Sequence, residues 1–322
     1  MVEINADTPC FIVESFYANG VAAEHFGRRD PNAGARTQLR DFLTQIHARL
    51  AAPVADLTKG TLPPRPFVFS CFDDYPEDLA NTRFLMQLMQ EGAPHGDIRF
   101  RSFYEMEIDD EGIPLIDNRY ATALYRLHPM EILIDERTAD GEPLGTMFLD
   151  LYQEGRFALM NPPEAILLQN KSFMALVYAL ARTEQFFTPE ECALIHRYLV
   201  PSYFEEDFAA LMDGTYIRKE IWGREGRNVR VVQKHCNEHT TAFEKEIDYA
   251  DEVICRESRA AMYQDFIAQP RFVHTVDSGT IEGCLTLSCF MLFGTPSAVG
   301  ARFSPSEIAG TEAYFVPLVV AE

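Results

Sequence analysis

The chain has 322 residues, of which 47% are apolar, so it can bury a sizeable core as one large or two ordinary domains. It holds 28 lysine and arginine residues against 49 aspartate and glutamate residues, and its formal charge is −21. This negative field repels polyanions, which disfavours nucleic acid and anionic membranes as partners. A cationic substrate such as a polyamine would be attracted, although many acidic proteins carry such a charge for solubility alone.

The cysteines and the N-terminus bear on the cellular compartment. The seven cysteines form no C-x-x-C pair, and an odd number disfavours a complete disulfide framework, so we expect reduced thiols. The N-terminus lacks a basic region followed by a long apolar run, and no segment reaches the ~18 apolar residues that a membrane helix needs. We therefore expect a soluble, cytoplasmic protein.

The first expected element is a helix over residues 7–27. Asp7 or Thr8 can cap this helix, and apolar side chains recur on one face. Glu3 and Asn5 precede it, and we expect them on the end of a strand.

The next elements alternate between helix and strand, as in an α/β layer. A proline-rich connection, 51–66, follows the first of them. The expected elements are a helix over 39–50, a buried strand over 66–72, a helix over 77–91, and strands over 98–108 and 121–127.

Two helices are expected in the second half of the chain, one from Asn170 and one over 189–198. Two β-rich runs follow, 216–223 and 228–234, and the polar sequence REGR between them predicts a hairpin with a mobile tip. The chain then continues as strands separated by glycines. We expect one compact, multi-lobed unit.

Three short patterns point to chemistry. Glu3 and Asn5 alternate, so on a strand both oxygens could bind one hard cation such as Mg²⁺, although a surface strand with solvated side chains is the alternative. Lys219 precedes the loop Gly223–Gly226, whose glycines and cations could cradle phosphates; an ordinary charged hairpin is the alternative. Lys171 stands at the start of an apolar helix, where a cation suits the helix dipole poorly unless an anion is near; otherwise it reaches solvent.

Two histidine patterns are weaker. His235, Cys236 and His239 have a spacing found among metal ligands, but further ligands are not evident nearby, so a solvated loop is the preferred interpretation. His128 is interpreted as a structural histidine with its hydrogen bonds satisfied.

Four segments together resemble the synthetase domain of the glutathionylspermidine synthase family. They are EINADTP (3–9), LYRLHPMEIL leading to LLQNK (124–171), YIRKEIWGREGRNV (216–229), and MYQDF with GARF and YFVP (262–317). The segments occur in the family's order and span nearly the whole chain. The REG loop and the NADTP box are the most specific of them.

The resemblance implies an α/β (α+β) fold of the ATP-grasp type in circularly permuted order, over residues 1–322. Three parts are expected: the metal-site strand and helices in 1–64, an α/β lobe in 65–160, and nucleotide-binding and closing lobes in 161–322. The family's Arg-Phe-Asp strand precedes the NADTP box and lies before Met1, so we expect the domain and its metal site to be incomplete. The amidase domain of bifunctional members is also missing, so Cys10 is not expected to be a nucleophile.

The resemblance also implies roles for individual residues. It assigns Glu3 and Asn5 to magnesium, and Lys171 and Lys219 to the ATP phosphates. It places Gln264 at the adenine hinge. It implies that Arg224, Glu225 and Gly226 form a phosphate lid that Asn228 supports. It also implies that Arg302 stabilises the acyl-phosphate. The sequence after Arg302 departs from the family's Arg-Glu-Asp ending, since Phe303 and Ser304 follow it.

The activity implied is an ATP- and magnesium-dependent ligase that joins a small-molecule carboxylate to an amine through an acyl-phosphate. Glutathione or another peptide and a polyamine are the substrates that the family suggests. The alternative is a non-catalytic ATP-binding or scaffold module, because a strand with one metal ligand is missing from the chain.

Overall fold

The computed structural model describes residues 1–55, 65–138, 140–224, 226, 228–235, 238–244, 260–276, 279–310 and 312–321. The chain divides into two compact units. Unit 1 comprises Met1–Asn5, Ile166–Thr286 and Ala301–Val316, and unit 2 comprises Ala6–Ala165, Leu287–Gly300 and Pro317–Glu322. The three-part division expected from the sequence stays a prediction.

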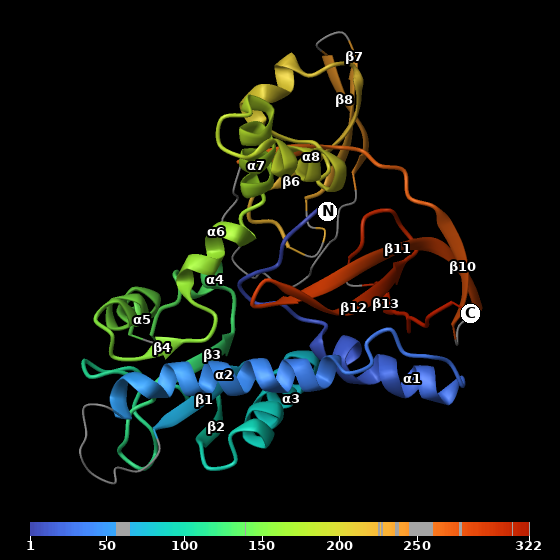
Figure 1. The fold of residues 1–322 in the computed structure, drawn as a ribbon. Helices are drawn as coiled ribbons and strands as arrows, with labels where there is room; N and C mark the ends of the chain where they lie inside the picture. Colours follow the sequence, from blue (N-terminus) through green and yellow to red (C-terminus); the bar gives the residue numbers. More distant parts are fainter. Residues whose placement is uncertain are drawn as a thin grey trace. The chain divides into compact units, whose positions relative to one another are not determined.

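Unit 2 contains a four-stranded parallel sheet with the order β2-β1-β3-β4 (Figure 1). All six residues of β1 are buried, which agrees with the nearly continuous apolar composition typical of inner parallel strands. The strands are β1 (Pro66–Cys71), β2 (Asp97–Ser102), β3 (Ala123–Leu127) and β4 (Ala158–Leu159).

Two long helices pack on this sheet. They are α2 (Ala35–Ala55) and α3 (Pro76–Gly92), and α3 starts with a proline and two acidic residues in its first turn, as the helix dipole favours. Leu43 of α2, Leu88 of α3 and Phe69 of β1 are fully buried in the shared core. Burial of each such side chain contributes roughly 1.5–3 kcal/mol. Unit 2 also contains the shorter helices η2 (Phe103–Glu105), α4 (Met130–Leu133), α5 (Leu144–Gln153) and η3 (Pro163–Ala165).

The start of the first expected helix is wrong. A π-helical segment, η1 (Glu14–Ala18), leads into α1 (Asn19–His25), and Asp7 does not cap a helix at residue 7. Asp7 is instead fully buried in an ion pair with Arg126 of β3, and its Oδ2 accepts a hydrogen bond of 2.9 Å from the backbone N–H of Met130. The carboxylate that could cap a helix is thus bound by the Arg126 guanidinium and the backbone of Met130, so it is not available to the first turn of a helix.

His128 follows β3 and is buried against the rings of Phe72 and Phe103. Its Nε2 lies 3.2 Å from Oε1 of Glu136. This packing agrees with the structural role expected from the sequence.

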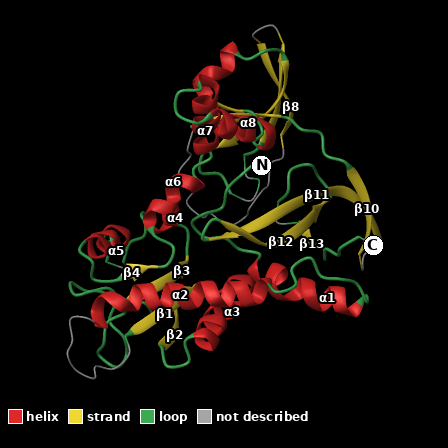
Figure 2. Cartoon of the chain, in the orientation of Figure 1, coloured by secondary structure: helices red, strands yellow, loops and turns green. Residues whose placement is uncertain are grey.

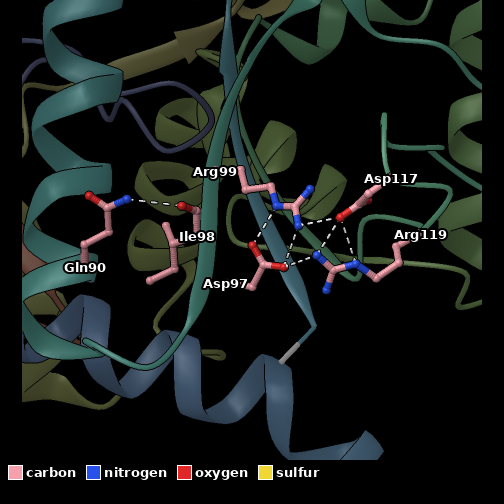
Figure 3. Close-up of polar contacts among 6 residues, drawn as sticks. All are labelled: Gln90, Asp97, Ile98, Arg99, Asp117 and Arg119. Atoms are coloured by element: carbon pink, nitrogen blue, oxygen red, sulfur yellow. Dashed lines mark hydrogen bonds and ion pairs between the residues drawn. The ribbon is translucent and has the colours of Figure 1, made fainter. Parts of the chain in front are cut away.

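Charged residues join the start of β2 to the loop that precedes β3 (Figure 3). Asp97 accepts hydrogen bonds from Arg99, and both Asp97 and Asp117 pair with Arg119 at 2.7 Å. Gln90 of α3 donates a hydrogen bond of 3.1 Å to the carbonyl oxygen of Ile98. These partly exposed pairs fix a loop to the sheet, but each contributes only about 0–1 kcal/mol.

Unit 1 contains a five-stranded antiparallel sheet with the order β5-β9-β6-β7-β8. The expected hairpin is present, because β6 and β7 pair antiparallel on either side of the loop 221–229. The strands are β5 (Ser202–Phe204), β6 (Gly214–Glu220), β7 (Arg230–His235), β8 (Glu238–Glu244) and β9 (Ala261–Asp265).

Helix α7 (Ser172–Thr183) packs against strands β5 and β9 of this sheet. Helices α6 (Ile166–Gln169) and α8 (Pro189–Tyr198) contact α7 (Figure 2). Thr188 and Glu191 form a capping box at the start of α8, which sets the helix start at the residue expected from the sequence. Met174 and Ala175 of α7 pack against Met262 of β9. The opposite face of the sheet carries a separate aromatic cluster, formed by Phe208, Tyr216 and Tyr263 with Val232, Tyr203 and Leu211 packed around it. A 3-10 segment, η4 (Glu205–Ala210), contributes Phe208.

A third sheet is antiparallel, with the order β10-β11-β12-β13. Its strands are β10 (Arg271–Val276), β11 (Gly279–Leu292), β12 (Thr295–Ser304) and β13 (Tyr314–Phe315), as the strand-like character of this region predicts. Parallel and antiparallel sheets with packed helices confirm the α/β (α+β) class. In the described part of the chain, no helix combines the length and apolar character needed to cross a bilayer.

Candidate functional site

Strands β6 and β9 bring Lys219 and Gln264 to one face of the sheet of unit 1. Lys219 lies opposite Met262, and Ile217 lies opposite Gln264. Opposite residues of an antiparallel pair share a face, so Lys219 and Gln264 are diagonal neighbours. The Nζ of Lys219 donates a hydrogen bond of 2.7 Å to Oε1 of Gln264. Met262 packs against α7, which identifies this face as the one that the helix covers.

Lys171 reaches the same place from the residue that precedes α7. Its backbone N–H donates to the carbonyl oxygen of Ile221 at 3.0 Å, and its Nζ donates to the carbonyl oxygen of Gly223 at 2.6 Å. The residue is 9% exposed, so its ammonium does not extend freely into solvent. The alternative of a lysine that reaches solvent is therefore wrong.

The N-terminal residues complete the site, although not as a strand. Residues 1–6 have no regular secondary structure, so the expected strand end is wrong. The backbone N–H of Val200 donates to Met1 at 3.2 Å, and the side chain of Gln264 donates to the carbonyl oxygen of Val2. The carbonyl oxygens of Met1 and Val2 accept these hydrogen bonds, so the two residues do not pair with a neighbouring strand through them.

The side chains of Glu3 and Asn5 nevertheless contact Lys171 and Gln169 of unit 1. The Glu3 carboxylate lies 3.5 Å from the Nζ of Lys171, and Oδ1 of Asn5 accepts a hydrogen bond of 3.4 Å from Gln169. Glu3, Lys171, Lys219 and Gln264 line one small pocket, together with Val2, Ile4, Leu168, Gln169, Asn170, Met174 and Met262.

The electrostatics of this pocket suit an anion. Burial is the main cause that lowers the pKa of Lys219 to about 8; the carboxylate of Glu3 opposes this shift and the ammonium of Lys171 adds to it. The pocket thus holds two lysine ammonium groups and one carboxylate, that of Glu3. Such a local excess of positive charge contrasts with the formal charge of −21 of the whole chain. A phosphate bound here would relieve the mutual repulsion of the two ammonium groups.

The loop between β6 and β7 packs within unit 1. Gly226 has φ +75°, and a Cβ there would stand 2.7 Å from the carbonyl oxygen of Ala309. Asn228 donates a hydrogen bond of 3.1 Å to Oε1 of Glu220, so it supports the loop. Glu225 lies outside the described residues, as does Arg227. The lid role of the loop stays a prediction.

The described predicted site residues that do not line the pocket are Asn5, Arg224, Gly226, Asn228 and Arg302. Arg224 belongs to the loop, directly after the residue whose carbonyl oxygen binds Lys171. Arg302 is exposed on β12, where it pairs with Phe315 of β13. Its role at an acyl-phosphate stays a prediction.

Magnesium can be assessed from the donor atoms. Among the described residues, no group of three or more histidine, cysteine, aspartate or glutamate side chains could hold a metal ion. Glu3 and Asn5 offer one carboxylate and one amide oxygen, which fits a Mg²⁺ ion that takes its other ligands from water and nucleotide phosphates. The zinc alternative at His235 involves Cys236, which lies outside the described residues.

Sequence reasoning missed Gln169 and Ser202. Gln169 binds Asn5, and the hydroxyl of Ser202 accepts a hydrogen bond of 2.9 Å from Gln264. Gln169 had a signal, since it stands two residues before Lys171. Ser202 had none, because its role depends on the pairing of β5 with β9.

The solved structures similar to this chain include the following two. One is a glutathione synthetase-like effector from Globodera pallida in its apo form, at 10% identity and a TM-score of 0.44, with 88% of this chain and 61% of that chain covered. The other is the ATP-grasp ligase PsnB complexed with a minimal precursor, at 14% identity and a TM-score of 0.31, with 80% of this chain and 89% of that chain covered. The chain thus spans about three fifths of the length of the effector.

A family model described as glutathionylspermidine synthase preATP-grasp matches residues 1–321. This match confirms the resemblance that the NADTP box and the REG loop indicate. The chain belongs to the glutathionylspermidine synthase preATP-grasp family.

Proposed function

We propose that the chain is an ATP- and magnesium-dependent ligase that joins a carboxylate to an amine. The observation that carries this proposal is the convergence of two lysine ammonium groups and the Glu3 carboxylate in one pocket. Lys171 and Lys219 would hold the phosphates of ATP, because charged hydrogen bonds to phosphate oxygens are among the stronger contacts a side chain makes. Family membership supports the same activity.

Glu3 and Asn5 would hold magnesium beside these phosphates. Bound there, the ion would neutralise phosphate charge and orient the triphosphate. The Glu3 carboxylate lies 3.5 Å from the Nζ of Lys171. Binding of the nucleotide with its metal would therefore replace one ion pair by two: phosphate with lysine, and carboxylate with metal.

The proposed reaction has two steps. A carboxylate oxygen of the acid substrate takes the terminal phosphoryl group of ATP, which forms an acyl-phosphate and ADP. The amine nitrogen then attacks the carbonyl carbon, a C–N bond forms, the C–O bond to phosphate breaks, and the amine loses a proton. No covalent bond to the protein is needed. Arg302 would stabilise the charge that develops on the acyl group.

Glutathione and a polyamine are the first acid and amine to test, since the family is described by that reaction. The net charge of −21 is suited to a cationic amine.

Titration calorimetry tests the nucleotide site directly. Lys219→Met should weaken binding of magnesium-ATP roughly tenfold or more, because a charged donor to phosphate contributes about 1.5–3 kcal/mol. Arg156→Met is the matched control, since it removes one positive charge at an exposed pair in unit 2. Equal binding by wild type and Lys219→Met, or no binding by wild type, would contradict the nucleotide site.

Release of ADP that depends on both an acid and an amine tests the ligase activity. If the protein binds ATP but no combination of acid and amine produces turnover, the chain is an ATP-binding module without catalysis.

A further inference from the structure

The side chain of Gln264 is polar but only 2% of the residue is exposed, so its hydrogen-bonding groups must find partners inside unit 1. Three partners are present. Oε1 accepts from Lys219 at 2.7 Å, and Nε2 donates to the carbonyl oxygen of Val2 at 3.2 Å and to Oγ of Ser202 at 2.9 Å. Both amide hydrogens are thus used.

The chemistry of these partners fixes which way the carboxamide points. A carbonyl oxygen only accepts hydrogen bonds, so the NH₂ group must face Val2. The hydroxyl of Ser202 donates its proton to the carbonyl oxygen of Val200 at 2.8 Å, so it accepts from Gln264. The remaining carboxamide oxygen has to face Lys219, whose ammonium only donates. The orientation therefore does not depend on how an ambiguous amide is assigned.

One carboxamide consequently joins three parts of the candidate site. It binds the lysine of β6, the strand β5 through Ser202, and the backbone of Val2, the residue before Glu3. A lysine side chain has four rotatable bonds, and its ammonium has no preferred direction until an acceptor fixes it. Two acceptors face the Lys219 ammonium: Oε1 of Gln264 at 2.7 Å and the carbonyl oxygen of Val2 at 3.4 Å. Gln264 is the nearer one, and it also holds Val2 in place.

The same contacts leave little room for a direct contact between this side chain and a base. An adenine ring could hydrogen-bond the carboxamide only by displacing Lys219, Val2 or Ser202, since the residue is 2% exposed. The location of Gln264 on β9 is compatible with a hinge, but its side chain faces the lysine.

We infer that Gln264 is a positioning residue, which holds the ammonium of Lys219 toward the phosphates instead of reading the adenine base. The inference rests on the proposed ATP site and assigns to Gln264 a role that acts through Lys219. It predicts that loss of Gln264 weakens recognition of the phosphate chain and leaves recognition of the base unchanged.

The test compares ATP with inorganic tripolyphosphate, each with magnesium, in titrations of four proteins: wild type, Gln264→Met, Lys219→Met and the double variant. Tripolyphosphate carries the phosphate chain without a base. Gln264→Met should weaken both ligands by the same factor, roughly two- to tenfold for the loss of one hydrogen bond to a charged group. In the Lys219→Met background the same substitution should have little further effect, because the group that it positions is gone.

Gln269→Met is the matched control, since Gln269 binds the carbonyl oxygen of Glu307 and does not line the pocket. It should bind both ligands as wild type does. If Gln264→Met acted only by disturbing the structure, its fold-loss of affinity would be the same with Lys219 present or replaced, so the two losses would multiply in the double variant.

Different failures separate the inference from the proposed function. If wild type binds neither ATP nor tripolyphosphate, the proposed nucleotide site is wrong and the inference falls with it. If wild type binds both, a loss confined to ATP assigns Gln264 to the base and overturns the inference alone. Multiplying losses in the double variant overturn it as well.

Ser202→Ala provides a second route if Gln264→Met does not fold. It removes only the hydroxyl that accepts from Nε2 of Gln264. We expect a smaller loss for both ligands that disappears in the Lys219→Met background. A loss that persists there would contradict a role through Lys219.

Discussion

Lys219 shows how one partly buried side chain links the fold to a measurable pH dependence. Its pKa is lowered from 10.5 to about 8, chiefly by burial. Between these two pH values the unfolded chain binds more protons at this residue than the folded chain does. The contribution of Lys219 to the unfolding free energy therefore rises with pH across this window and is constant below it.

Binding of ATP should respond to pH in the opposite direction. Only the protonated form of Lys219 attracts a phosphate, so affinity for magnesium-ATP should fall above about pH 8, by up to roughly tenfold per pH unit. Calorimetry between pH 7 and 9.5 measures this slope. Lys219→Arg retains the charge at every pH and should give a flatter profile. A wild-type profile as flat as that of the variant would show that no proton is taken up at Lys219.

At the level of a single element, Gly226 determines the conformation of the loop between β6 and β7. Its positive φ and the close approach of Ala309 leave no space for a side chain. The alternating apolar residues on both sides predict the hairpin, and they cannot predict what the tip touches. That contact depends on the segment 308–309, far away in the sequence.

Gly226→Ala should therefore disturb the loop more than the sheet. The strained backbone costs about 1–3 kcal/mol, to which the contact with Ala309 adds. We expect weaker binding of magnesium-ATP with a small change in thermal stability, and faster hydrogen exchange over 221–229. Gly155→Ala is the control, since Gly155 also has positive φ but a Cβ there meets nothing within 4 Å. Equal effects of the two substitutions on ATP binding would contradict a specific role for the tip.

The buried pair of Asp7 and Arg126 acts at the scale of the whole molecule, because it joins residues 119 positions apart within unit 2. Both side chains are fully buried. Asn161 also donates to the backbone of Asp7, at 2.9 Å. The pair fixes the start of unit 2 on the parallel sheet.

Removal of one partner should be costly. Asp7→Asn leaves the Arg126 charge buried without its counterion, and we expect a loss of about 3–5 kcal/mol in the unfolding free energy. Denaturant unfolding measures it. Arg156→Met breaks an exposed pair with Glu111 and should cost less than about 1 kcal/mol. Comparable losses in both variants would show that the buried pair has no special weight.

The sequence alone determined the elements with strong local signals. The helix expected over 189–198 is α8, and the apolar run over 66–72 contains β1. It also determined the family, because the NADTP box and the REG loop are specific as motifs. Both kinds of feature are written in short stretches of sequence, so they can be found without knowledge of the fold.

Only the tertiary structure decided what the polar residues contact. Asp7 suits a helix cap in sequence, but the fold gives it Arg126. Gln264 and Lys219 lie 45 positions apart, and their contact exists because β9 pairs with β6 in a register that places them diagonally on one face. A shift of that register by one residue would turn one side chain to the opposite face. Register follows from the packing of the whole sheet, which no short stretch of sequence contains.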